Sequence, residues 1–375
     1  MNNSGWPHRL YALDASRGFA ALAVVLCHWQ HLAYQGYSLP ADFVQESQPL
    51  YGILRLFYEQ GARAVQYFFL LSGFIFFWLY RESIQNRETS ARAFFVQRFS
   101  RLYPLHLLTL LIVAGLQLLY ISREHISYIY SFNDVYHFFL NLGFASNWGF
   151  EKGWSFNAPV WSVSIEILLY IIFFLVAFFR QGWWLFCLSV SIGSSVLDHI
   201  TGYFIFNGLA LFFLGGFVFY LTFLLSTRIR ILKAPIYLMT TIAWSLVISN
   251  FYNFDLSSIV LYFGIVGKIF LIGFPNYVLF PLTVCSLALL EIDNGALLKP
   301  VSWMGDISYS SYLLHFPLQM VFGLAVSYHI LSSGFYLNPV YLLLYFVILI
   351  PMSYIVYLKF ERPMQRTIRN HMNRF

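Results

Sequence analysis

An aspartate, an arginine and a histidine stand near the start of the chain, in and just after Leu13-Asp14-Ala15-Ser16-Arg17-Gly18. Asp14 and Arg17 are three residues apart, a spacing at which an acid and a base share one helix face and can pair. His28 follows Arg17 after three helical turns, on the same face and roughly 16 Å along the axis. A histidine there can accept a proton. The alternative is an interfacial ion pair with a histidine that reaches toward the outer surface, and His31 is expected to be a solvated interfacial residue.

A carboxylate, Glu166, closes the pattern Trp161-Ser162-Val163-Ser164-Ile165-Glu166 inside another apolar run. A carboxylate beside an imidazole fixes its tautomer and raises its basicity. The segments that hold His28 and Glu166 are expected to cross a bilayer in opposite directions, which puts both residues near the outer face. We therefore expect Glu166 to support His28 as a general base. The alternative is that Glu166 faces the solvated loop region and pairs with Lys152 or Arg123.

Two arginines, Arg98 and Arg101, are three residues apart in Arg98-Phe99-Ser100-Arg101-Leu102-Tyr103-Pro104. Arginines at this spacing point the same way from a helix and present a fork of N–H donors, which suits a phosphate group. The alternative is that both are simple positive charges that anchor a helix end on the cytoplasmic side of a membrane. The spacing by itself leaves both interpretations open.

Two further segments place small or polar residues within apolar stretches. Ser72 and Gly73 allow another helix backbone to approach closely, which is a packing role in most membrane helices. In the segment Gly305 to Pro317, polar residues recur with the spacing of one helix face; they are Ser308, Ser311, Tyr312 and His315. We expect this stripe to line a cavity. A single histidine such as His315 more often makes an interhelical hydrogen bond.

The composition identifies the solvent that these elements require. Of 375 residues, 59% are hydrophobic and 10% are charged, against about 25% charged in soluble domains. The run from Gly61 to Tyr80 matches the ~20 apolar residues of a spanning helix. The net charge of +6 is spread between apolar runs, which excludes a basic nucleic-acid domain. Cys27, Cys187 and Cys285 lack metal-ligand or disulfide spacing, so no metal site is expected.

Apolar runs bounded by charged or turn residues predict an all-α, polytopic membrane protein with ten crossings. The predicted spans are 10–33, 61–80, 99–120, 161–179, 183–198, 203–225, 234–250, 276–291, 308–330 and 339–359. An eleventh piece, Ser257 to Gly273, is expected to lie in the outer leaflet or to re-enter the membrane. Ten crossings put both termini on one side, and the basic tail from Lys359 to Arg374 places that side in the cytoplasm. The outer loop Ile121 to Val160 is expected to lie on the membrane surface, and residues 1–375 form one predicted domain.

Six motifs, taken in order, resemble membrane-bound acyltransferase family three, whose members O-acetylate bacterial surface polysaccharides and some antibiotics. They are LDxxRG with Arg-x10-His, FFxxSGF, RFxRLYP, WSxSxE, GxISYxxYLxHxP and the closing Glu361-Arg362-Pro363. The likeness covers nearly the whole chain. It implies about ten helices around a polar pore in the bacterial inner membrane. It also implies transfer of acetyl, or a related short acyl group, from cytoplasmic acetyl-CoA to a hydroxyl of an extracytoplasmic glycan or similar acceptor.

The resemblance assigns a role to each matching position. It implies that the catalytic residues are His28, Glu166, Arg17 and Asp14. The expected donor-binding residues are Arg98 and Arg101 at the coenzyme phosphates, with Ser72 and Tyr309 around the pore. The expected acceptor-binding residues are Trp161, Ser164 and His315. Ile-Leu follows Glu166 where many relatives have a second acidic residue and a glutamine, so acceptor contacts are expected to differ. The esterase-like domain that many relatives carry after the helices is not expected here.

Other classes of protein also place polar groups within a membrane. A transporter or flippase for a saccharide or an acylated substrate is the principal alternative, although no inverted repeat is visible in the sequence. A third alternative is a structural scaffold, in which Arg17, His28 and Glu166 would have no function. Direct transfer and a transient acyl-histidine are both open, and a homodimer is possible.

Overall fold

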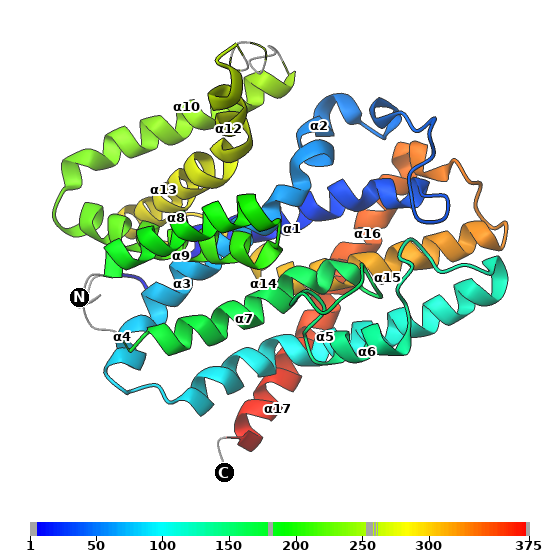
Figure 1. The fold of residues 1–375 in the computed structure, drawn as a ribbon, viewed down its shortest axis with the longest axis horizontal. Coiled ribbons are helices and arrows are strands. Elements are labelled where there is room, and N and C mark those ends of the chain that lie inside the picture. Colours follow the sequence, from blue (N-terminus) through cyan, green and yellow to red (C-terminus); the bar gives the residue numbers. More distant parts are fainter. Residues whose placement is uncertain (1–5, 179–182, 253–257, 259, 261, 373–375) are drawn as a thin grey trace. The chain divides into compact units, whose positions relative to one another are not determined.

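The computed structural model describes residues 6–178, 183–252, 258, 260 and 262–372. Within these residues the regular secondary structure is helical (Figure 1), apart from one isolated β-bridge between Gln35 and Ser38. The prediction of an all-α protein is confirmed. The contacts divide the chain into two compact units, which are described separately below.

Eight helical segments of the described residues are long and apolar enough to cross a membrane. They are Tyr51–Leu79, Ala91–Glu124, Ala158–Val176, Trp183–Thr201, Phe204–Thr227, Arg230–Tyr252, Val266–Asn294 and Pro339–Met372. Each overlaps a predicted crossing, and the chain is a multi-pass membrane protein. The other two predicted crossings correspond to α1 (Tyr11–Cys27) and α15 (Ser308–Ser327), which form as helices but are not among the eight. These two helices carry many of the polar side chains of the motifs.

The eleventh apolar piece, Ser257 to Gly273, includes residues 257, 259 and 261, which lie outside the described residues. Its residues 264–273 lie in α12 (Gly264–Phe274). That helix passes through a π-helical turn, Pro275–Leu279, into α13 (Phe280–Asn294). Residues 264–274 therefore extend the predicted span 276–291 within one helical run.

The first unit comprises residues 1–20, 62–88 and 169–305. Its α-helices are the start of α1, α3 (Ala64–Leu79), α4 (Arg81–Gln85), the end of α7 (Trp161–Val176), α8 (Trp183–Thr201), α9 (Phe204–Thr227), α10 (Lys233–Tyr252), α12, α13 and most of α14 (Trp303–Asp306). The backbones of α3 and α9 touch because each helix presents a glycine to the other. A Cβ on Gly73 would lie 1.8 Å from the carbonyl oxygen of Phe212, and one on Gly215 would lie 2.0 Å from that of Leu70. The predicted close approach of another backbone is confirmed at Gly73, and the part of Ser72 in it stays a prediction.

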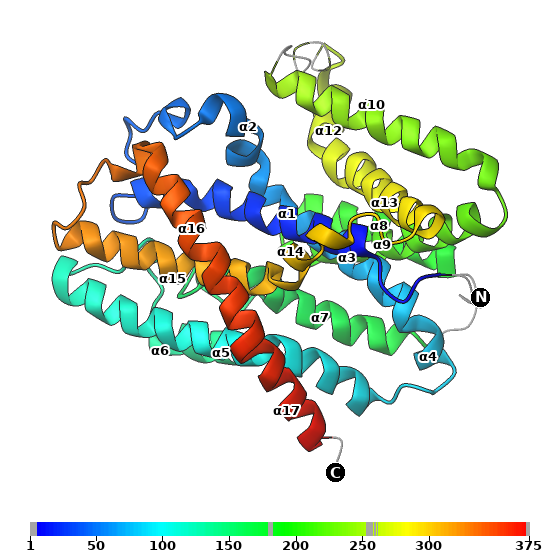
Figure 2. The same cartoon turned by 180° about the vertical axis from the view of Figure 1, so that it is seen from behind.

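The second unit comprises residues 21–61, 89–168 and 306–375. Its long helices are α5 (Ala91–Glu124), α15 and α16 (Pro339–Val356), followed by α17 (Arg362–Met372). Shorter helices are η1 (His28–Ala33), α2 (Tyr51–Gln60), α6 (Val135–Leu142) and the start of α7 (Trp161–Val176). Helices α5 and α15 lie side by side (Figures 1 and 2). Apolar clusters on both sides of α15 fix it, one centred on Trp29 and Tyr345 and the other on Tyr128 and Phe316.

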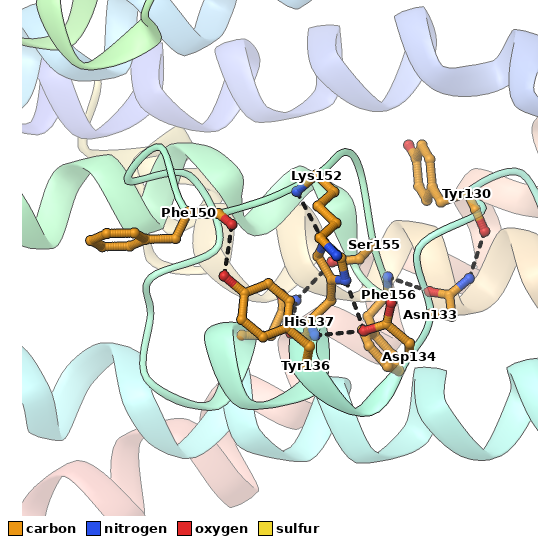
Figure 3. Close-up of polar contacts among 10 residues, drawn as sticks. Tyr130, Asn133, Asp134, Tyr136, His137, Phe150, Lys152, Ser155 and Phe156 are labelled. Carbon is orange, nitrogen blue, oxygen red and sulfur yellow. Dashed lines mark hydrogen bonds and ion pairs between the residues drawn. The ribbon is translucent and has the colours of Figure 1, made fainter.

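The long loop after α5 folds around one buried histidine. His137 is 1% exposed; its Nδ1 lies 2.8 Å from Asp134 Oδ1, and its Nε2 accepts the N–H of Lys152 at 3.1 Å. Asp134 also caps α6 by accepting the N–H of His137 at 2.9 Å, which satisfies a helix-end donor. Figure 3 shows these contacts beside the bond from Tyr136 to the carbonyl of Phe150. The loop is therefore an ordered part of this unit, and its predicted place on the membrane surface stays a prediction.

Candidate active site

Two histidine rings stack where α1 gives way to a 3-10 helix. Helix α1 ends at Cys27, and η1 continues from His28 to Ala33. Side chains three residues apart eclipse each other in a 3-10 helix. The rings of His28 and His31 accordingly lie 4.5 Å apart between centroids, with an interplanar angle of 20°. His31 is 7% exposed, so the expectation of a solvated histidine is wrong, because the tighter turn directs it inward.

A third histidine, His315 on α15, contacts the first. Its Nε2 lies 2.9 Å from Nδ1 of His28, and the two rings are 5.1 Å apart at 26°. The interhelical hydrogen bond that was the simpler expectation for His315 is therefore present. Gln319, one turn further along α15, donates to the carbonyl oxygen of His28 at 2.8 Å, and its Oε1 lies 3.3 Å from Nδ1 of His31. These four residues form what we call the histidine cluster.

Members of the histidine cluster differ in how far solvent or a ligand can reach them. His315 and Gln319 are fully buried, and His31 is enclosed by the rings of Tyr34, Tyr130 and Phe316. His28 keeps partial exposure. Among these four residues, His28 is the only one that is not buried. Over the described residues, no group of three or more His, Cys, Asp or Glu side chains has the geometry to hold a metal ion.

The polar stripe of α15 connects the histidine cluster to the start of α7. The Nδ1 of His315 lies 2.6 Å from the carbonyl oxygen of Tyr312. The hydroxyl of Tyr312 donates to the carbonyl oxygen of Pro159 at 2.7 Å and lies 2.9 Å from Ser162 Oγ. Ser308 and Ser311 are also buried. The side chains of the stripe thus pack into the protein, and a cavity along them stays a prediction.

The WSxSxE segment lies on the first turns of α7. Ser164 is buried, and its Oγ accepts the N–H of Asn147 at 3.1 Å, so it ties the preceding loop to the helix. Trp161 meets Trp154 edge to face, with ring centroids 6.0 Å apart. Glu166 is partly buried and close enough to Tyr312 for an electrostatic interaction. Its predicted support of His28 stays a prediction.

The two arginines of RFxRLYP lie in the N-terminal third of α5, in a stretch that α15 and α17 contact. The hydroxyl of Tyr309 donates to the carbonyl oxygen of Leu102 at 2.7 Å. Arg369 of α17 reaches the same stretch: its Nε lies 3.2 Å from Ser100 Oγ. Arg98 and Arg101 therefore stand on a helix end that α15 and α17 both brace.

The ERP motif has a structural role that the sequence did not reveal. Glu361 is 5% exposed and accepts a hydrogen bond from Ser310 at 2.6 Å. This contact joins the π-helical turn Tyr357–Glu361 to α15. A buried carboxylate needs such donors to remain in place, so the motif holds α15 against the C-terminal helices.

The Asp14 and Arg17 pair lies in the first unit. Arg17 Nη2 is 3.1 Å from Asp14 Oδ1, and it also donates to the carbonyl oxygen of Gly305 at 2.7 Å. The predicted ion pair is confirmed. A Cβ on Gly305 would lie 2.2 Å from the backbone oxygen of Asp14, which explains the glycine that opens the GxISY motif. Because His28 belongs to the second unit, its predicted shared face with Arg17 stays a prediction.

Comparisons with known proteins agree with this assembly of motifs. A family model described as an acyltransferase domain matches residues 10–358. Acyltransferase MdmB from Streptomyces mycarofaciens is 33% identical over 167 residues, a stretch that covers 44% of this chain and 38% of that relative. No solved structure matches the chain significantly. Since the family model covers most of the sequence, the chain belongs to acyltransferase family three, the family that its motifs resemble.

Proposed function

We propose that this membrane acyltransferase moves an acetyl group, or another short acyl group, from acyl-CoA to a hydroxyl of an extracytoplasmic glycan or similar acceptor. The observation that carries the proposal is the partly exposed His28, held at Nδ1 by a second imidazole within a chain of this family. A neutral imidazole with one ring nitrogen hydrogen-bonded has its other nitrogen available to accept a proton, as a general base requires.

The proposed reaction is a direct transfer. His28 takes the proton of the acceptor hydroxyl, and the oxygen attacks the thioester carbonyl carbon. The tetrahedral intermediate then expels the coenzyme thiolate, which receives the proton from His28 and leaves as the free thiol. The ester bond forms as the thioester bond breaks, so no other reactant is needed. Holding both substrates at one imidazole supplies the proximity that such a reaction requires.

The proposed donor site is the N-terminal end of α5. Arg98 and Arg101 offer guanidinium donors suited to the coenzyme phosphates. The contacts of Tyr309 and Arg369 with this part of α5 support the proposal, since they donate to the backbone oxygens of Leu102 and Gln97 and so hold the helix in place. In this proposal the donor remains on the cytoplasmic side of the bacterial inner membrane, and only the acyl end of its arm approaches His28. The proposed role of Ser72 is to contact the pore that admits this arm.

The proposed acceptor site is the outer loop with the start of α7. Aromatic side chains are exposed there, with Trp154 40% and Phe150 60% accessible, and amphipathic rings of this kind suit the apolar faces of sugars. Trp161 packs against Trp154, and Glu166 lies a short distance along α7. The proposed role of Arg17, with Asp14, is to offset negative charge on the donor.

The first test is acyl transfer by the purified protein. We expect His28→Ala to lower transfer from radiolabelled acetyl-CoA to glycan acceptors by about 1,000-fold or more, within the range of general-base effects, while the protein stays folded and inserted. Release of free coenzyme thiol measures the same step. Tyr58→Phe, a substitution of a buried residue on α2, serves as the matched control. Full activity of His28→Ala would contradict the proposal.

The acceptor class is tested in cells. Mass spectrometry of surface glycans from cells with and without the protein is expected to show one additional acetyl unit per modified residue. Unchanged glycans, together with protein-dependent movement of an unmodified saccharide across the membrane, would instead support the transporter alternative.

A further inference from the structure

We infer that His315 is a positioning residue that holds His28 in the tautomer with its proton on Nδ1, so that Nε2 is the atom that accepts the acceptor's proton. The inference rests on the proposed function. Its evidence is the order of donors and acceptors around the two rings.

The assignment of protons starts from a backbone carbonyl, because a carbonyl oxygen can only accept a hydrogen bond. The carbonyl oxygen of Tyr312 can only accept, so Nδ1 of His315, 2.6 Å away, carries a proton. The His315 ring is completely buried, and it faces backbone acceptors of Tyr312 and Ser311 on one side and the His28 imidazole on the other. An imidazolium in such a place is costly without a paired anion. His315 is therefore neutral, and its Nε2 has a lone pair.

The lone pair on Nε2 of His315 determines which ring nitrogen of His28 carries the proton. Nε2 of His315 accepts, so Nδ1 of His28, 2.9 Å away, is the donor. A neutral imidazole has one N–H and one ring nitrogen that can accept, so the accepting nitrogen of His28 is Nε2. When Nε2 takes a proton, the Nδ1–H bond to His315 becomes charge-assisted and stronger. His315 thus fills the place that a carboxylate fills in a serine protease triad.

Gln319 orders the backbone around the same ring. The carbonyl oxygen of His28 accepts from the Gln319 amide nitrogen at 2.8 Å, which fixes the amide orientation and turns its oxygen toward His31. His31 therefore donates from Nδ1 as well. Because His315 and Gln319 are four residues apart on one face of α15, a single helix holds both imidazoles of η1.

Nuclear magnetic resonance of the full-length protein tests the tautomer without an activity assay. In protein labelled with 15N-histidine, the His28 signals are identified by their loss in His28→Asn. We expect a pyrrole-type Nδ1 and a pyridine-type Nε2 in the wild type. A protonated Nε2 with an unprotonated Nδ1 at neutral pH would overturn the inference.

Substitutions at His315 test its effect on the rate. We expect His315→Leu to lower kcat by about 100-fold or more, since the wrong tautomer of a catalytic histidine is strongly inactivating, with little change in the KM for acyl-CoA. His315→Gln keeps an amide oxygen near the position of Nε2 and is expected to recover activity to within about 10-fold of the wild type. Tyr345→Phe is the control, because it removes a buried hydrogen bond to the backbone oxygen of His315 at 2.7 Å and leaves the ring pair intact.

The outcomes separate the inference from the proposed function. A wild type that transfers acyl groups, with His315→Leu equally active or His315→Gln no better than His315→Leu, refutes the positioning role alone. A wild type with the expected tautomer but no transfer to any hydroxyl acceptor refutes the proposed function. If His315→Leu fails to fold, the wild-type spectrum and the His315→Gln rate still decide.

Discussion

Single residues in this protein take their roles from the partners that the fold supplies. His28 and His137 are both histidines bonded at Nδ1, yet they differ in what surrounds Nε2. In His137 the Nε2 accepts the backbone N–H of Lys152, and the ring is 1% exposed, so both nitrogens are used within the loop. In His28 the Nδ1 is hydrogen-bonded to His315, and the residue is partly exposed. His137 is accordingly a structural residue, and His28 is the histidine that we propose a substrate reaches.

Asp134 gives a prediction about pH. The backbone N–H of His137, and then its side chain, donate to this carboxylate and hold the pKa of Asp134 below its ordinary value of 3.8. A lowered pKa in the folded state adds stability above pH 3.8, which is lost as the pH falls through the folded-state pKa.

The measurement is the thermal unfolding of the wild type and Asp134→Asn in the same detergent, from neutral pH down to about pH 3. The lower end of this range lies below the ordinary pKa of an aspartate carboxyl. The wild type is expected to be more stable at neutral pH, with a difference that shrinks as the solution becomes acidic. Asp42→Asn, a substitution of an exposed residue in the loop before the short 3-10 helix Gln45–Ser47, is the control. A difference that does not depend on pH would contradict the assignment.

Helix packing depends on a few positions without side chains. On α3, an added Cβ at Gly73 would lie 1.8 Å from a carbonyl oxygen of α9, and backbone cannot yield as a flexible side chain can. We expect Gly73→Ala to destabilise the protein by about 1–3 kcal/mol, the usual cost of overpacking. Denaturant or thermal unfolding in detergent measures the change.

The matched control is Gly193→Ala on α8, where an added Cβ meets nothing within 4 Å. This substitution is expected to be neutral or slightly stabilising, because alanine is the better helix former. Equal effects at the two glycines would show that the contact between α3 and α9 does not limit stability.

Helix α5 carries the proposed donor site, and its arginines can be tested together. We expect Arg98→Ala with Arg101→Ala to raise the KM for acyl-CoA by about 10-fold or more, since each hydrogen bond to a charged group contributes about 1.5–3 kcal/mol. The KM for the acceptor is expected to change little.

The control for this prediction is Arg92→Ala, which removes an exposed arginine from the same helix. Its guanidinium donates to the backbone oxygen of Met372 at 2.6 Å. An unchanged donor KM in the double variant would assign Arg98 and Arg101 to membrane topology instead.

At the scale of the whole molecule, the orientation in the membrane is the main prediction. The basic C-terminal segment after α16 is expected in the cytoplasm. A fluorescent protein fused to the C-terminus is therefore expected to fluoresce, and alkaline phosphatase fused there is expected to be inactive. Alkaline phosphatase fused after Ser131, in the outer loop, is expected to be active. The reverse pattern would place the donor arginines on the wrong side for a cytoplasmic acyl-CoA.

The sequence alone determined the features that depend on neighbours along the chain. Apolar runs of spanning length predicted the helices, because helix length and side-chain polarity are local properties. The ion pair of Asp14 and Arg17 was predictable for the same reason, since residues three apart always meet on a helix. The close approach at Gly73 followed from small residues within an apolar helix, although its partner on α9 did not.

Only the tertiary structure decided the contacts that join distant segments. His28 and His315 are 287 residues apart, and no periodicity links them. The inward turn of His31 depends on the change from α to 3-10 geometry after Cys27, which packing against α15 selects. A hydrogen bond between two helices requires a specific depth, rotation and tautomer, and these are set by packing of the whole unit rather than by local sequence.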